Sequence, residues 1–203
     1  MTNEEKKELQ KSRMKTYFIE STKELIKEIG IENITTKKIG DRAGYSYATI
    51  YNYFENFNEL ICICIKEFSE EMKNDLEEKS SNIENNIEKI YTITRLSIDY
   101  AVKNINIYNL FLSNSIDFTY FKNTDDHRFI HPGYLLLTDI MEHIPEFSEF
   151  SPPEIHAFAD ILFSLFHAKM QFFITLKYPD TKEELEKDIF SNLDFLINKT
   201  LQK

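Results

Sequence analysis

The stretch TTKKIGDRAGYSYATIYNYFENFNEL, residues 35–60, decides the fold of this 203-residue chain. Thr35 offers a hydroxyl at a helix start, where backbone N–H groups lack partners. Ile39 and Ala43 lie four residues apart, which puts both on one apolar face of a helix. Gly44 follows directly, and glycine just past a helix end commonly takes the left-handed conformation that other side chains disfavour. The pattern therefore predicts a short helix, a tight turn and a second helix.

The second predicted helix, from Ser46 to Phe54, has an unusual surface. Ser46 is placed to cap it, and Ile50 and Phe54 share one apolar face. The helix carries no charged residue, whereas a solvated helix normally carries Lys and Glu. Its other positions hold hydroxyl, amide and methyl groups, which are the groups that contact base edges and phosphates in a major groove. Two short helices joined by a glycine turn predict a helix-turn-helix whose second helix reads DNA.

Residues 30–60 resemble the DNA-binding domain of the TetR family of bacterial transcriptional regulators. The resemblance is specific because many positions match at fixed spacing: Gly30, Thr35, Thr36, Lys37, Ile39, Arg42, Ala43, Gly44, Ser46, Thr49, Ile50, Tyr51, Tyr53, Phe54, Asn56 and Leu60. It implies an all-α fold, with an N-terminal three-helix DNA-binding domain followed by a larger helical domain that binds a ligand and dimerises. The expected boundaries of the two domains are residues 1–57 and 58–203.

The resemblance also implies a set of DNA contacts. Thr36 would bond a phosphate, and Lys37 would reach a phosphate or a base edge. Tyr47, Ala48 and Thr49 would face the bases. The remaining expected contacts, at the helix start and along the sugar-phosphate backbone, are Ser46, Tyr51, Asn52 and Tyr53.

Charge is distributed unevenly along the chain. The formal net charge is -10, but residues 1–60 carry equal numbers of basic and acidic side chains, so the excess of acid lies after residue 60. Lys37, Lys38 and Arg42 cluster beside the reading helix in the sequence. The TetR family usually has a phosphate-binding lysine where this chain has Phe57, which puts one charged contact per half-site in doubt. We expect fewer phosphate contacts and a shallower salt dependence than for a strongly basic domain.

The composition favours long helices, because there are only 4 Gly and 5 Pro while hydrophobic residues make up 42% of the chain. The first thirteen residues form a highly polar segment that either frays or extends the first helix, which Gly30 ends. Apolar periodicity predicts helices over residues 14–29, 58–79, 83–103, 105–115, 133–144, 153–178 and from 181 onward.

The last two predicted helices are unusually apolar, and two explanations stay open. They could pack in the core of one chain, or they could form a four-helix interface with a second copy. The resemblance implies the second, and so does geometry, because paired reading heads about 34–36 Å apart read two half-sites of a two-fold symmetric operator. The expected interface residues are Phe158, Leu162, Phe166, Leu185, Ile189, Leu193 and Leu196.

Aromatic residues recur on the helices that would wrap an interior cavity. They suit a small apolar or aromatic effector, although aromatic side chains at helical spacing are also ordinary core residues. In the same way, His167 fits either a ligand anchor or a hydrogen-bonded core histidine. The expected pocket residues are Tyr91, Tyr100, Tyr108, Phe111, Tyr134, Phe163, His167 and Met170.

Enzymatic and metal-dependent functions lack their signatures. The chain has no glycine-rich phosphate loop, nucleophile elbow or zinc-protease helix, so we expect neither an enzyme nor a cofactor. The group closest to a metal constellation is Asp125, Asp126, His127 and His131, but Pro132 and Gly133 adjoin it, and we expect no metal site.

The cysteines and the hydrophobic runs indicate a cytoplasmic protein. Cys62 and Cys64 are two residues apart, so on a helix they point away from each other and cannot form a disulfide. We expect buried free thiols in a reducing compartment. No secretion signal is present, and no apolar run approaches the roughly 20 residues of a membrane span.

Two functions therefore remain. The first is a dimeric DNA-binding repressor that a ligand releases from its operator by changing the separation of the two reading heads. The second is a DNA-independent helical sensor or partner-binding protein that keeps the helix-turn-helix as a scaffold. Phe57 and the neutral reading head favour the second slightly.

Overall fold

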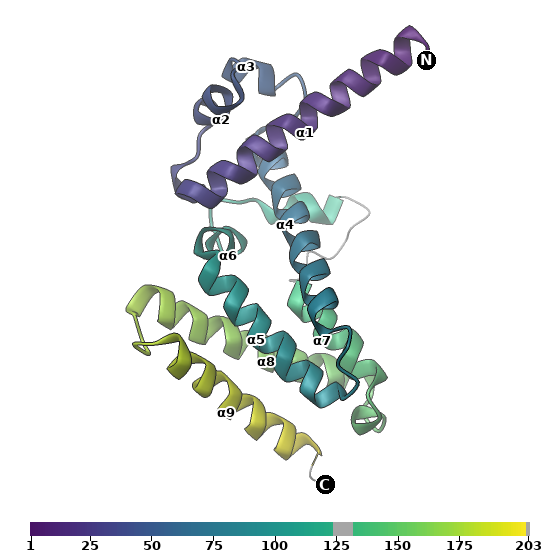
Figure 1. Ribbon diagram of the computed structural model, residues 1–203, viewed down its shortest axis with the longest axis vertical. Helices are drawn as coiled ribbons and strands as arrows, with labels where there is room; N and C mark the ends of the chain where they lie inside the picture. Colours follow the sequence, from purple (N-terminus) through teal and green to yellow (C-terminus); the bar gives the residue numbers. More distant parts are fainter. Residues whose placement is uncertain (124–131, 202–203) are drawn as a thin grey trace. The chain divides into compact units, whose positions relative to one another are not determined.

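The computed structural model of the protein describes residues 1–123 and 132–201, and throughout these residues the regular secondary structure is helical (Figure 1). The all-α prediction is confirmed. The chain divides into two compact units, one made of residues 1–70 and 104–129 and the other of residues 71–103 and 130–203. The predicted boundary after residue 57 coincides with the start of helix α4, whereas the division into units falls within that helix.

The first unit is built around helix α1. Its elements are α1 (Asn3–Ile29), η1 (Ile31–Asn33), α2 (Thr36–Ala43), α3 (Tyr47–Ile50), the first part of α4 (Phe57–Ser80), α6 (Ile105–Phe111) and η2 (Phe118–Asn123). Helix α1 packs against α2 and α6, and α2 packs against α3. Phe18, Ile26, Ile39 and Ile50 are completely buried and form the core between these helices, which fixes α2 and α3 on the side of α1.

The end of α1 is defined by Gly30, as the sequence predicts. Gly30 has φ 71° and its N–H donates to the carbonyl of Ile26. An amide from α6, Asn106 Nδ2, donates to the carbonyl of Lys27 at 2.9 Å. The last carbonyls of α1, which have no partner within the helix, are thus satisfied by the glycine turn and by α6.

The start of α1 settles the question that the sequence leaves open about the first thirteen residues. They extend the helix rather than fray, because Thr2 and Glu5 form a reciprocal capping box. The side chains of residues 1–13 are all exposed. Helix α1 therefore continues well past the residues that pack against α2 and α3 (Figure 1).

The second unit is a packed group of longer helices. Its elements are the last turns of α4, α5 (Asn86–Lys103), α7 (Pro132–His143), η3 (Pro145–Phe147), α8 (Pro152–Gln171), the π-helix η4 (Phe172–Leu176) and α9 (Lys182–Leu201). A capping box begins the last helix, because Glu184 N–H donates to the Thr181 hydroxyl at 3.2 Å and the Glu184 carboxylate accepts from Thr181 N–H. Helix α8 and η4 together stop before Pro179, close to the predicted end.

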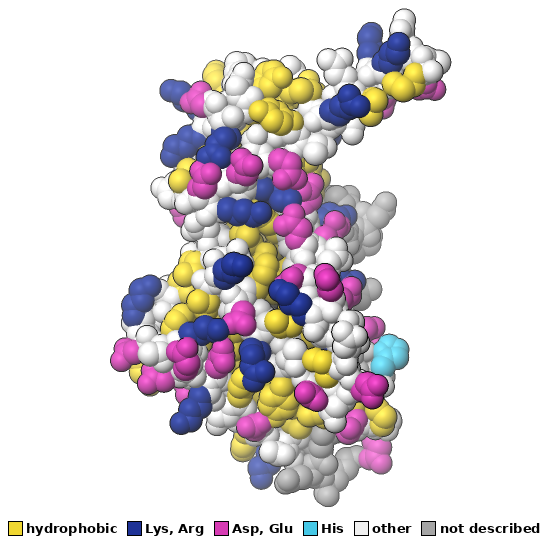
Figure 2. Space-filling view, in the orientation of Figure 1, with side chains coloured by type: hydrophobic (Ala, Val, Ile, Leu, Met, Phe, Trp, Pro, Cys, Tyr) yellow, Lys and Arg dark blue, Asp and Glu magenta, His cyan; other side chains and the backbone are white. Residues whose placement is uncertain are grey.

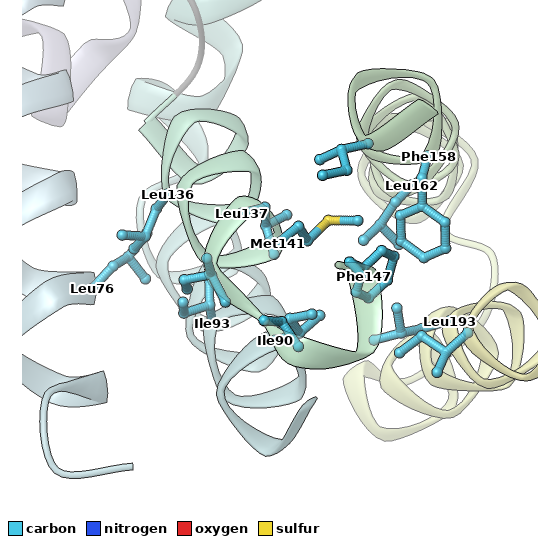
Figure 3. Packing of buried hydrophobic residues seen from close by; sticks show 14 of the residues in the cluster. Leu76, Ile90, Ile93, Leu136, Leu137, Met141, Phe147, Phe158, Leu162 and Leu193 are labelled. Atoms are coloured by element: carbon cyan, nitrogen blue, oxygen red, sulfur yellow. The ribbon is translucent and has the colours of Figure 1, made fainter. Parts of the chain in front are cut away.

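The core of the second unit lies where α7 packs against α5 and α8, and α8 against α9. Figure 3 shows the side chains of these helices meeting. Phe147 sits among them, with its ring centroid 5.4 Å from that of Phe158. The buried cluster contains Met72, Leu76, Ile90, Ile93, Leu136, Leu137, Ile140, Met141, Ile144, Phe147, Ile155, Phe158, Leu162, Leu193 and Ile197.

Helix α8 with η4 requires a correction to the expectation that nothing resembles a membrane span. Residues Pro152–Leu176 are long and apolar enough to cross a membrane by length and composition alone. One such helix is weak evidence for a membrane, because core helices of soluble proteins pass the same test. Only 28% of its most apolar stretch is buried in the chain, and Ile161, Phe172 and Leu176 are exposed.

Candidate nucleic-acid interface

Helix α2 has the start and end that the sequence predicts. The Thr35 hydroxyl accepts from the backbone N–H of Lys38 at 3.3 Å and caps the helix. Gly44 closes it in the left-handed conformation, with φ 73° and ψ 24°. The N–H of Tyr45 then donates to the carbonyl of Gly40 at 2.9 Å, which turns the chain toward α3.

A close backbone contact holds α3 against α2, and it depends on Gly40. A Cβ at this position would lie 2.8 Å from the carbonyl oxygen of Tyr45 and 3.0 Å from the backbone nitrogen of Tyr47. Both neighbours are backbone atoms, so no side-chain rotation relieves the clash. Gly40 was not among the predicted site residues, although a glycine in the middle of a predicted helix was an available signal.

The reading helix is shorter than predicted. Helix α3 spans Tyr47–Ile50, and residues 51–53 form a turn rather than the continuation to Phe54. The N–H of Asn52 donates to the carbonyl of Thr49, and that of Tyr53 to the carbonyl of Ile50. These hydrogen bonds join residues three apart, as in a 3₁₀ turn, instead of four apart as in an α-helix. The apolar residues Ile50 and Phe54 still face the core, because they are 0% and 2% exposed.

The opposite side of this segment is open and uncharged. Tyr47 is 58% exposed and Tyr51 48% exposed, and Ala48 and Asn52 are exposed as well. Among the other predicted contacts, Lys37 and Ser46 are exposed, and the half-buried ones are Thr36, Thr49 and Tyr53. The structure thus brings the predicted contact residues together along α2, α3 and the following turn, with hydroxyl, amide and methyl groups presented to solvent.

Helix α1 braces this segment through aromatic contacts. The Phe18 ring lies 5.7 Å from that of Tyr45 and 5.6 Å from that of Tyr53. Tyr17 meets Tyr45 edge-to-face at 6.4 Å, and the Lys15 ammonium lies over the Phe54 ring at 5.5 Å. The rings on either side of α3 are therefore held by one rigid helix.

The basic cluster inferred from the sequence is smaller in the structure. The Arg42 guanidinium pairs with two α1 carboxylates, donating to Glu28 Oε1 at 3.0 Å and to Glu24 Oε2 at 3.2 Å. The Arg42 hydrogen bond lowers the pKa of Glu28. The Lys38 ammonium donates to the carbonyl of Asn33 at 2.8 Å. Of the three residues in the cluster, Lys37 alone has an exposed ammonium without one of these contacts, while Arg42 and Lys38 fix α2 to its neighbours.

The residues predicted to line a pocket fall into separate places. Tyr108 and Phe111 are buried in the first unit, and the other six lie in the second. Within the second unit Phe163 is central: its ring lies 5.5 Å from that of Tyr134 and 4.2 Å from that of His167. Burial lowers the pKa of His167 to about 4, so this imidazole is neutral at pH 7.

The remaining predicted pocket residues of the second unit lie elsewhere in it. Tyr91 turns toward α9, where its hydroxyl donates to the Asp194 carboxylate and its ring lies 5.8 Å from that of Phe190. Tyr100 packs against the core cluster, and Met170 is completely buried. The structure therefore groups Tyr134, Phe163 and His167 and separates Tyr91 from them.

The predicted interface residues are mostly buried within one chain. Phe158, Leu162, Phe166, Leu185, Ile189 and Leu193 are at most 7% exposed within one chain, and Leu196 is partly buried. Phe158, Leu162 and Leu193 belong to the core cluster of the second unit, and Leu196 packs against it. Contact of the seven residues with a second copy stays a prediction. The apolar side chains that α8, η4 and α9 leave exposed are Ile161, Phe172, Leu176 and Phe195.

The two cysteines match the expectation of buried free thiols. Burial raises the pKa of Cys62 to about 11 and also raises that of Cys64, so both are protonated at pH 7 and poor nucleophiles. The sequence group Asp125, Asp126, His127 and His131 lies outside the described residues. Among the residues that the structure does describe, no group of metal-binding side chains is found.

Comparison with known proteins agrees with this geometry. Residues 18–61 match the family model described as bacterial regulatory proteins, tetR family. No curated protein matches the chain. The solved structure of the fatty acid degradation regulator FadR from Bacillus halodurans is similar over 90% of this chain and 94% of that one, with a TM-score of 0.67 and 13% identity.

Two other solved structures have the same fold over nearly their whole length. RolR in complex with resorcinol matches 96% of each chain, with a TM-score of 0.64 and 14% identity. A TetR transcriptional regulator from Rhodococcus sp. RHA1 covers 91% of this chain and 96% of its own, with a TM-score of 0.62 and 16% identity. The segment that presents the open face of α3 therefore belongs to the TetR family of bacterial regulators, and the whole chain has the fold of a TetR-family transcriptional regulator.

Proposed function

We propose that this protein is a homodimeric transcriptional regulator that represses genes by binding a two-fold symmetric operator, and that a small apolar or aromatic effector releases it. TetR-family regulators are DNA-binding transcription factors rather than enzymes. One observation carries the proposal for this chain. The uncharged face of Tyr47, Ala48, Tyr51 and Asn52 stands open to solvent on a rigidly braced helix-turn-helix.

The chemistry of that face suits duplex DNA. The Ala48 methyl and the Thr49 hydroxyl are small enough for α3 to approach base edges closely. The Tyr47 phenol would reach a base edge beside them. The Tyr51 phenol and the Asn52 amide would bond the sugar-phosphate backbone. At the start of α2, the Thr36 hydroxyl and the Lys37 ammonium would hold a phosphate, where unpaired backbone N–H groups also favour an anion.

The apolar surface of α8 and α9 supports dimerisation. Ile161 is 54% exposed, Leu176 67% and Phe195 61%. Exposed apolar patches of this kind mark interaction sites, and a second copy of the chain would cover them. Two copies would also supply the pair of reading heads that an operator with two half-sites requires.

The aromatic residues of the second unit support an effector of aromatic or apolar type. Tyr134, Phe163 and the neutral His167 make edge-to-face contacts with one another and would stack on a flat ligand in the same way. RolR, which shares the fold, was solved with resorcinol, a small aromatic compound. We propose that the effector changes the separation of the two reading heads, with α4 as the coupling element because it runs from one unit into the other.

Selection of bound duplexes from a random DNA pool tests the proposal. The full chain is expected to enrich one sequence with two-fold symmetry, bound as a dimer. The double variant Tyr47→Ala/Thr49→Ala is expected to lose affinity for that duplex by at least about 30-fold, because two base-facing contacts are each worth about 1–3 kcal/mol. The melting temperature of this variant should stay within a few degrees of that of the unmodified chain, because Tyr47 is exposed and Thr49 is half-buried. Failure to enrich any duplex would refute DNA binding.

A DNA-independent helical sensor or partner-binding protein remains the second candidate. The pairing of Arg42 with Glu24 and Glu28 favours it, because it withdraws a cation from the reading head. This candidate predicts no duplex selection and no effect of the Tyr47 and Thr49 substitutions on partner binding. Such a protein and a regulator would both act in the cytoplasm, where we place this chain.

A further inference from the structure

The projecting start of α1 is the part of the first unit that the helix-turn-helix does not use. From residue 1 to residue 13 every side chain is exposed, yet the capping box holds the segment as helix. At about 1.5 Å per residue, the eleven residues from Asn3 to Arg13 project by roughly 16 Å. A major groove is about 12 Å wide, so this helix is long enough to pass beyond the groove that α3 would occupy.

The charges on this projection are segregated. At about 100° per residue, Lys6, Lys7, Lys11 and Arg13 fall within an arc of about 160° around the helix, and Glu4, Glu5 and Glu8 fall on the other side. In the part of the chain that the structure describes, none of these four cations forms an ion pair. Figure 2 shows dark-blue basic side chains along the projecting end. An ordinary solvated helix intersperses its charges, so this one has a distinct basic face.

The basic face is in register with the reading head. Lys7, Gln10 and Lys11 lie seven residues before Met14, Tyr17 and Phe18, and residues seven apart share a helix face. Met14, Tyr17 and Phe18 are the residues of α1 that contact Tyr45, the residue at the turn into α3. The Tyr45 hydroxyl lies 3.7 Å from Met14 Sδ, and its ring meets those of Tyr17 and Phe18. Lys7 and Lys11 are therefore on the side of α1 that carries α3.

We propose that the basic face of residues 6–13 binds the DNA phosphate backbone outside the base pairs that α3 reads, as an arm that extends each half-site. This rests on the proposed function, because it requires operator binding by the helix-turn-helix. The arm supplies cations to a head in which Arg42 is paired to carboxylates and Phe57 occupies the place of a phosphate-binding lysine. It contributes affinity without sequence preference, since phosphate contacts carry no base information.

The test compares full-length variants on the duplex that the unmodified chain selects from a random pool. Lys7→Gln/Lys11→Gln is expected to weaken operator binding by about 10-fold or more at 0.1 M salt. It is also expected to reduce the slope of log K against log salt by roughly 1 for each phosphate that the variant no longer neutralises. Lys7→Arg/Lys11→Arg retains both cations and should bind normally. The matched control Lys103→Gln/Lys199→Gln removes the same charge from exposed positions in the second unit and should leave the salt slope unchanged.

A second measurement locates the arm on the DNA. Trimming the duplex to the edges of the two half-sites should weaken binding of the unmodified chain and leave the Lys7→Gln/Lys11→Gln variant unaffected. Equal salt slopes and equal sensitivity to trimming in the two proteins would refute phosphate binding by the basic face of residues 6–13. The selected duplex would still support DNA binding by the helix-turn-helix. If no duplex is selected at all, the proposed function itself fails, which separates the two inferences.

Discussion

At the scale of single residues, Gly40 controls where the reading helix sits. Gly40→Ala adds a methyl group 2.8 Å from one backbone atom of the turn and 3.0 Å from another. Alanine favours helix by about 1 kcal/mol over glycine, but the clash forces α3 away from α2. We expect thermal melting to show a net loss of about 1–3 kcal/mol in the free energy of unfolding. We expect titration of the operator with the folded variant to show a loss of affinity of at least about 10-fold.

Gly44→Ala is the matched control for that prediction, because nothing lies within 4 Å of an added Cβ there. Its cost comes only from the positive φ of 73°, about 1–2 kcal/mol for a residue with a side chain. It should lower the melting temperature yet leave α3 in place and operator affinity within a few-fold. Normal affinity in Gly40→Ala and a large loss in Gly44→Ala would contradict this account of the turn.

Other residues show what the sequence predicts and what it does not. The Thr35 cap, the Gly44 turn and the buried Ile50 depend on neighbours within a few positions, so the local pattern was enough. The ion pairs of Arg42 with Glu24 and Glu28 join positions 18 and 14 residues apart. Their formation depends on how α1 and α2 pack, and a count of charges in the sequence does not contain that information.

At the scale of elements, the next prediction concerns the apolar strip of α8 and η4, which consists of the exposed residues Ile161, Phe172 and Leu176. Ile161→Glu places a carboxylate on a surface that we propose a second copy covers, and burying an unpaired charge costs several kcal/mol. The variant should sediment as a monomer and lose most of its operator affinity while keeping its helical content. The exposed loop variant Asn82→Glu makes the same charge change elsewhere and should remain dimeric. A dimeric Ile161→Glu protein would exclude this strip as the interface.

The same element shows what an apolar pattern leaves open about the interface. A stripe of apolar residues at helical spacing indicates a buried face, but it does not tell which surface covers it. On α8 the stripe that includes Phe158 and Leu162 is covered by the core of its own unit, whereas Ile161 is exposed. The predicted length of α3 was too long for a similar reason. The residues after Ile50 form a tight turn because of how they pack on the rest of the unit, and the local sequence does not show that packing.

At the scale of the whole molecule, the uneven charge shapes how the protein would meet DNA. The acidic excess lies after residue 60 and repels the phosphate backbone, so contact through the neutral first sixty residues, with the basic face of α1, is favoured. Repulsion away from the reading head also disfavours non-specific binding along the duplex. The molecule would thus gain selectivity for its operator at the expense of general affinity for DNA.

The proposed dimer predicts a strict dependence on the spacing of the half-sites. Two heads held about one helical turn apart, 34–36 Å or 10–10.5 base pairs, read the same face of the duplex. Inserting five base pairs at the centre of the selected operator rotates one half-site by about half a turn and separates it further, so only one head can engage. We expect affinity for the lengthened operator, measured by titration, to fall toward that of a single half-site. As a control, changing the sequence of the central base pairs while keeping the operator length should have little effect on affinity. Equal affinity for the normal and lengthened duplexes would mean that the heads are not held at a fixed separation, and an effector that changes this separation could not then control release.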